Sequence, residues 1–223
     1  MSTTDIFKAI SDGNIDTLKE LLRRDQSLAE AKNESGVSAL MFSLYMGRRE
    51  ITDPIVAARA DLDTFEAAAL GNETALRKQI DQNRNQIKAY SADGFTALHL
   101  ACFFGRTSAG KILIDAGADL DANSKNGANL KPINSAAACR DLDAAYQMVS
   151  ALLGNGADIS AKQNGGFTAL HSAAANGNVR LVKLLLEKGA DPHVLSDDKK
   201  TPLQFAQERN RTEIVELLSG VSC

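Results

Sequence analysis

The sequence contains few residues that could catalyse a reaction or bind a metal, and their spacing suits neither task. None of the three histidines has a cysteine or a second histidine at the spacing of zinc ligands. The three cysteines are odd in number and follow no metal-binding or disulfide pattern, so they indicate reduced thiols, mostly buried as small apolar groups. These residues are His99, His171 and His193, and Cys102, Cys139 and Cys223.

One stretch imitates a nucleotide-binding loop. Residues 105–111 read Gly-Arg-Thr-Ser-Ala-Gly-Lys and match the phosphate-loop pattern as far as its lysine. The next residue should be Ser or Thr, whose hydroxyl binds magnesium, and Ile112 cannot do this. No nucleophile elbow, His-Glu-x-x-His pair or paired-cysteine motif occurs in the sequence. We therefore predict no catalysis, no cofactor and no metal ion, and an enzyme without a recognisable motif is the minor alternative.

Composition and charge favour a protein partner over a nucleic acid or a membrane. The chain has 223 residues, is 44% apolar and 24% charged, and has a formal net charge of −3. Basic and acidic residues alternate along its whole length, whereas a nucleic-acid surface needs a basic face. No leader pattern begins the sequence, and no apolar run approaches the roughly 18 residues of a membrane span. We expect a cytoplasmic protein without nucleic-acid or membrane partners.

A repeated segment is the strongest feature of the sequence. Residues 94–99 read Gly-Phe-Thr-Ala-Leu-His, and the same six residues return at 166–171. In both copies a Gly-Ala-Asp segment begins sixteen residues after Ala101 or Ala173. Thr-Pro-Leu-Gln-Phe-Ala begins at Thr201, thirty-three residues after Thr168. This resembles the ankyrin repeat, whose signature is Thr-Pro-Leu-His-x-Ala at a period of about 33 residues.

The resemblance extends over the chain when each repeat is aligned on the small residue that follows the histidine position. It implies an all-α solenoid of helix–turn–helix units with short β-turn fingers, in about seven repeats including caps. The aligned residues are Ala9, Ser43, Ala67, Ala101, Ala136, Ala173 and Ala206. The predicted single domain, 1–223, divides into repeats 1–33, 34–62, 63–90, 91–124, 125–162, 163–196 and 197–223. The short array without a further domain is similar to stand-alone bacterial ankyrin proteins.

Each part of the motif that recurs along the chain has a physical role. Thr96 is expected to cap a helix start with its hydroxyl, and Gly105 and Gly177 to end first helices in a left-handed conformation. The small aligned residues allow neighbouring helices to approach closely, and stacked repeats bury what one helix pair cannot. In the family, the histidine at the position of His99 and His171 joins neighbouring fingers through backbone hydrogen bonds, and the resemblance implies the same here.

Three departures from the pattern produce specific expectations. Only 24 residues separate Ser43 from Ala67, so we expect the finger between them to be missing. Pro54 lies inside the second helix of that repeat, which we expect to start late or to kink. Four extra residues between Ala136 and Gly156 are expected to enlarge the turn at 139–145, either as a partner contact or as neutral variation.

The resemblance places the partner-binding surface on the finger tips and the open side of the first helices. Aromatic residues are scarce in this chain, so several at these positions suggest a binding surface; the alternative is that some of the rings pack into neighbouring fingers. The predicted binding residues are Tyr45, Met46, Phe95, Phe103, Phe104, Phe167, Asn176 and Lys200.

The predicted function is therefore binding of a protein partner by a monomeric chain. Within that class, an inhibitor or immunity protein that blocks an enzyme is the main alternative, and a secreted effector is another. The fold itself does not identify the partner.

Overall fold

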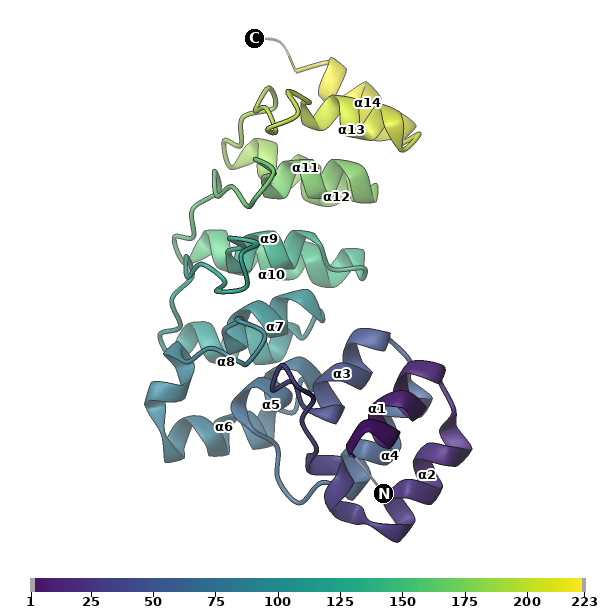
Figure 1. Ribbon diagram of the computed structural model, residues 1–223. Helices are drawn as coiled ribbons and strands as arrows, with labels where there is room; N and C mark the ends of the chain where they lie inside the picture. The colour runs from purple at the N-terminus through teal and green to yellow at the C-terminus, as the bar shows by residue number, and fades with distance from the viewer. Residues whose placement is uncertain (1–2, 222–223) are drawn as a thin grey trace.

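The computed structural model describes residues 3–221, which form short α-helices in consecutive pairs (Figure 1). The described residues contain fourteen α-helices and no β-strand. The helix pairs are α1 (Thr3–Asp12) with α2 (Ile15–Arg24), α3 (Ala39–Met46) with α4 (Arg49–Ala58), α5 (Thr64–Leu70) with α6 (Glu73–Gln82), α7 (Ala97–Phe103) with α8 (Thr107–Asp115), α9 (Pro132–Ala137) with α10 (Leu142–Gly154), α11 (Ala169–Asn176) with α12 (Val179–Glu187), and α13 (Pro202–Glu208) with α14 (Thr212–Ser219). Two 3₁₀ segments follow the first and third pairs, at Gln26–Glu30 and Arg84–Lys88.

The ends of the first helices follow the expected chemistry. The Thr96 side chain accepts a hydrogen bond from the His99 amide at the start of α7. Gly105 and Gly177 follow α7 and α11 with φ of 67° and 81°, a region that residues with a Cβ rarely adopt. The fingers are hydrogen-bonded turns, such as the one that Ser91 and Phe95 close through their backbones. Hydrogen-bonded turns, and not a β-sheet, therefore connect one helix pair to the next.

Close contact between first helices forms the inner layer of the solenoid. Ser43, Ala67, Ala101 and Ala136 are fully buried where these helices meet. Side chains from both helices of each pair extend one apolar core along the chain. Small residues are needed there because a larger side chain would push neighbouring repeats apart.

The regular stacking is interrupted between α4 and α5. Only residues 59–63 join these helices, so the finger is missing, as the short spacing predicted. Every other pair of neighbouring second helices packs together, whereas α4 and α6 make no comparable contact. Figure 1 shows α1 to α4 lying beside the column that α7 to α14 form. Pro54 lies inside α4, which begins at Arg49, so the expected late start is wrong, and the alternative kink stays a prediction.

The four extra residues of the fifth repeat lengthen a helix and leave the turn unchanged, which corrects the expectation from sequence. The residue that precedes each second helix lies five positions after the aligned alanine: Arg106 follows Ala101, and Asp141 follows Ala136. Helix α10 has 13 residues, whereas α8 and α12 have 9 each. Four residues add about one helical turn, so the extension keeps the buried face of α10 in register.

Candidate partner-binding surface

Three of the predicted binding aromatics form a partly buried cluster over α3, α5 and α7. Tyr45, Phe95 and Phe104 pack around a small buried group that includes Leu100. The rings of Tyr45 and Phe104 lie 5.5 Å apart, and the Tyr45 hydroxyl donates to the carboxylate of Asp93. Burial, followed by the Asp93 hydrogen bond, raises the pKa of Tyr45. These three rings therefore help to hold the repeats together.

Phe103 and Met46 are the exposed members of the predicted set in this region. Phe103 is 45% exposed and Met46 is 41% exposed. The Phe103 ring meets the edge of Phe104 at 5.1 Å, so the buried cluster supports it from one side. A large apolar side chain held rigidly at the surface has the character of an interface anchor.

Two hollows adjoin Phe103. One has a volume of about 180 Å³ and is mainly apolar, with Tyr45, Phe95, Leu100, Leu130 and Ala138 among its walls. The other has a volume of about 490 Å³ and lies between Phe103 and Phe104 and the residues that precede α10. Phe103 lines both hollows, of which the smaller is mainly apolar and the larger is also lined by charged side chains.

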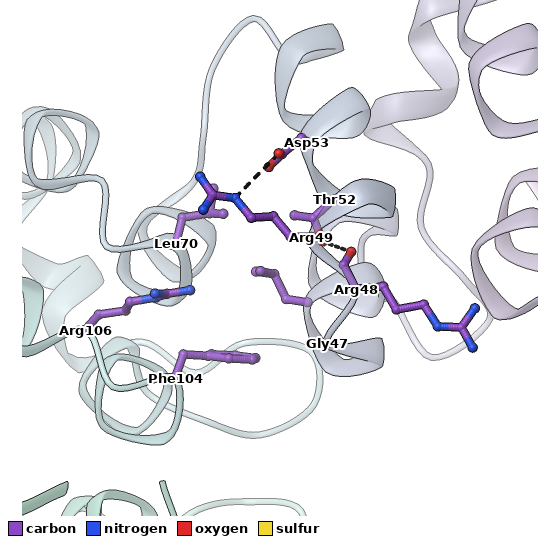
Figure 2. A pocket seen from close by; sticks show the side chains of 9 residues that line it. Gly47, Arg48, Arg49, Thr52, Asp53, Leu70, Phe104 and Arg106 are labelled. Carbon is purple, nitrogen blue, oxygen red and sulfur yellow. Dashed lines mark hydrogen bonds and ion pairs between the residues drawn. The ribbon is translucent and has the colours of Figure 1, made fainter. Parts of the chain in front are cut away.

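A third hollow opens at the turn between α3 and α4. Its volume is about 400 Å³, and Figure 2 shows its walls converging from α4, the end of α5 and the turn after α7. Phe104 and Arg106 line this hollow and the 490 Å³ hollow. The three hollows therefore adjoin one another through Phe103 and Phe104.

The other predicted residues do not join this cluster. Phe167 packs against Phe205 at 5.1 Å, toward the C-terminal end of the solenoid. Lys200 forms an ion pair with Glu208 at 2.6 Å. The Asn176 side-chain amide donates to the carbonyl of Ala137 at 3.2 Å, which joins α11 to the preceding repeat. These contacts lie outside the group around Leu100, and a common surface framed by Phe95 and Phe167 stays a prediction.

The two repeated histidines bridge neighbouring repeats. The backbone amide of Thr96 donates to Nδ1 of His99, and Nε2 of His99 lies 2.9 Å from the carbonyl of Leu130. His171 makes the equivalent contacts with Thr168 and Lys200, both at 3.2 Å. An amide donor at Nδ1 requires that nitrogen to be unprotonated, so Nε2 carries the hydrogen and the ring is neutral. Burial lowers the pKa of both histidines.

At the junction without a finger, a buried ionic cluster that was not predicted from the sequence replaces this arrangement. Glu66 is the third residue of α5, as His99 is of α7, and its carboxylate accepts from the Ser38 hydroxyl at 2.7 Å and from Arg59 at 2.6 Å. The Arg59 and Glu66 side chains are 8% and 1% exposed. Arg59 also donates to the carbonyl of Ala29 and pairs with Glu30. The sequence signal was available, because a carboxylate as the third residue of a helix, where α7 and α11 carry histidine, needs nearby donors.

The remaining reactive groups form no recognisable centre. No group of three metal-ligating side chains occurs within residues 3–221. Cys102 and Cys139 are buried free thiols, and burial raises the pKa of both. Cys223 lies outside the described residues.

None of the helices in the described part of the chain is both long and apolar enough to span a membrane.

Comparison with known families identifies the fold. The family description "Ankyrin repeats (3 copies)" matches residues 64–162 and 135–223, which together cover well over half of the chain. The chain belongs to the ankyrin-repeat family. Ankyrin repeats are in general non-catalytic modules for protein–protein interaction, and this defines the broad function of the chain. The match begins at residue 64, where α5 starts immediately after the missing finger.

Curated relatives match through part of their length. The chain is 36% identical over 129 residues to the B-cell lymphoma 3 protein homolog of Mus musculus, covering 57% of this chain and 27% of the relative. It is 29% identical over 203 residues to ankyrin repeat and SOCS box protein 3 of Bos taurus, covering 90% and 33%. It is 28% identical over 175 residues to an L-asparaginase of Dirofilaria immitis, covering 66% and 30%. The chain thus spans about a third or less of each of these relatives.

Proposed function

We propose that this ankyrin-repeat chain binds a protein partner across α3, α5, α7 and α9, with Phe103 as the central anchor. The observation that carries the proposal is the combination of a 45% exposed ring with two hollows that this ring lines. Interface energy concentrates in large apolar side chains beside pockets, because partner side chains displace water there. Met46, at the end of α3, extends the exposed apolar surface.

The partly buried aromatics support this anchor without being equally available to a partner. Phe104 and Tyr45 pack against each other beneath the exposed edge of Phe103. A change at Phe104 would therefore remove packing between repeats as well as binding surface. Phe103 alone is the better probe of the proposed interface.

The test compares Phe103→Ala with the unchanged chain in capture of partners from native lysate, with captured proteins identified by mass spectrometry. We expect the affinity for a specifically captured partner to fall about 30-fold, corresponding to about 2 kcal/mol for a central anchor. Leu195→Ala is the matched control, because Leu195 is also 45% exposed but lines none of the three hollows. Equal capture by the Phe103 and Leu195 variants, with unchanged thermal unfolding, would refute the proposed anchor.

Blocking a partner enzyme is a narrower version of the same function. Once a partner has been captured, adding the purified chain to an assay of that partner distinguishes inhibition from simple attachment. Loss of partner activity that Phe103→Ala relieves would support the inhibitor version.

A further inference from the structure

The 400 Å³ hollow of Figure 2 lies where α3 turns into α4, beside the ends of α5 and α7. Neighbouring second helices pack on each other along the column of regular repeats, whereas α4 and α6 make no comparable contact. The hollow is lined by the start of α4 and by no residue of α6 or of 59–63, so it opens on the side of the helix turns and not at the missing finger. Its lining residues are Leu44, Gly47, Arg48, Arg49, Thr52, Asp53, Leu70, Phe104 and Arg106.

The walls of this hollow are rich in arginine. Figure 2 shows Arg49 and Arg106 extending toward each other from opposite walls, whereas Arg48 points away. The Nε of Arg106 donates to the carbonyl of Ala69 at 2.9 Å, and Arg106 forms no ion pair with any residue from 3 to 221. Its guanidinium therefore keeps further N–H donors for a ligand. Arg49 pairs with Asp53 at 3.5 Å, but both side chains are largely exposed, so the pair is weak and exchangeable.

The positive charge continues into the neighbouring hollow. Arg140 lines the 490 Å³ hollow beside Phe103 and forms no ion pair among the described residues. Asp141 also lines this hollow, but its carboxylate already accepts from the first amides of α10. The 180 Å³ apolar hollow lies on the other side of Phe103. A partner that follows these hollows would meet arginines, then aromatic rings, then an apolar compartment.

We propose that the segment bound along this path is a linear acidic peptide with one bulky apolar side chain. This inference rests on the proposed function and specifies the chemistry of the partner. The apolar side chain occupies the 180 Å³ hollow beside Phe103, and carboxylates lie between Arg49 and Arg106 and next to Arg140. Guanidinium groups recognise carboxylates through paired, charge-assisted hydrogen bonds. The local positive charge contrasts with the net charge of −3 of the whole chain, so it favours an acidic partner at this surface.

The first experiment selects a displayed library of random linear peptides on the immobilised full chain. We expect the enriched sequences to combine a large apolar residue with nearby Asp or Glu. Enrichment of basic or uncharged sequences, or no enrichment over a blank surface, would overturn the proposal.

The second experiment titrates the most enriched peptide, carrying a fluorescent label, against charge-reversed variants. Arg49→Glu and Arg140→Glu should each weaken binding about tenfold at low salt, and by less at high salt, because screening shortens the reach of the charges. Arg77→Glu is the control, since Arg77 is exposed on α6, lines none of the hollows and changes the net charge equally. Equal loss in all three variants would show a general charge effect and overturn the site.

Phe103→Ala, titrated with the same peptide, separates this inference from the proposed function. If Phe103→Ala weakens binding and the arginine variants match the control, the anchor stands and the acidic partner is refuted. If the arginine variants weaken binding and Phe103→Ala does not, the peptide occupies the charged hollows alone, which refutes both the proposed anchor and the two-part path. Circular dichroism melting of each variant confirms that a loss of binding is not a loss of folding.

Discussion

At the junction between α4 and α5, the buried carboxylate of Glu66 accepts hydrogen bonds from the preceding repeat. In α7 and α11, by contrast, a histidine donates a hydrogen bond to the next repeat. Glu66, His99 and His171 are each the third residue of their helix, and all accept from the amide of the residue that precedes that helix. A histidine ring has a second nitrogen that can donate to the next finger. A carboxylate has only acceptors, so Glu66 takes its remaining partners from Ser38 and Arg59.

In α9 the third residue is an asparagine. Joining neighbouring repeats therefore requires one hydrogen-bond acceptor and one donor rather than an imidazole ring. Asn134 accepts from the amide of Lys131 at 3.0 Å and donates to the carbonyl of Ala161 at 3.1 Å. The regular junctions are therefore joined by neutral groups, and the shortened junction by charged ones. This difference predicts that the junctions respond differently to mutation and to pH.

The largest expected effect is at the ionic junction. Arg59→Ala should lower the free energy of unfolding by about 3–5 kcal/mol, because it leaves the Glu66 carboxylate buried without its cation. Burial raises the pKa of Glu66, whereas the Ser38 hydrogen bond and the charge of Arg59 act against this rise and favour the ionised carboxylate. Chemical denaturation measures the change, with the exposed Arg77→Ala as the control.

A double variant sharpens this comparison. Arg59→Met with Glu66→Leu removes both charges and should recover much of the loss, since apolar groups of similar size can replace a buried ion pair. If Arg59→Ala lowered the free energy of unfolding no more than Arg77→Ala, the ionic cluster would not be what stabilises this junction.

A smaller effect is expected at the neutral junctions. His171→Ala should lower the free energy of unfolding by about 1–2 kcal/mol, because two buried hydrogen bonds are lost without exposing a charge. His171→Asn should lose less, since Asn134 makes both types of bond at the equivalent position. Denaturation of the two variants side by side measures the difference. A variant with alanine that kept full stability but lost partner binding would contradict the structural role of this histidine.

The smallest effect is a pH dependence confined to the neutral junctions. Burial lowers the pKa of His99 and His171 below the unfolded value of about 6.5. Their contribution to stability is therefore fully present above about pH 6.5 and is lost as the pH falls through the lowered folded-state pKa values. Melting temperatures at about pH 7.5 and pH 5.5 should differ more for the unchanged chain than for the double variant His99→Asn with His171→Asn. Equal differences would mean that other groups cause the acid response.

The sequence predicted the fold well because ankyrin signals are local. Thr96 and Gly105 begin and end a helix through bonds to residues nearby in the chain, so their types alone indicate the element. The missing finger was also predictable, since a turn needs a minimum number of residues. The position of the extra residues in the fifth repeat was not, because both a longer turn and a longer α10 fit the same length.

The candidate site was predictable only in outline. The motif placed Tyr45, Phe103 and Phe104 at the ends of first helices, but the contact between two repeats decides which ring stays exposed. The surroundings of Phe167 likewise depend on Phe205, which packs against it from the next repeat. A period in the sequence gives the position within each repeat and says nothing of how neighbouring side chains share the space between repeats.

By itself, the sequence determined the family, the helix pairs and the absence of a finger after α4, because each depends on residue type and spacing along the chain. The tertiary structure alone decided that Arg59 neutralises Glu66, that Phe103 remains exposed, and that arginines line the hollow at the turn between α3 and α4. These features join side chains from different repeats, so they depend on the distance and angle between helix pairs. That geometry is set by packing over the whole solenoid and has no signal in any single repeat.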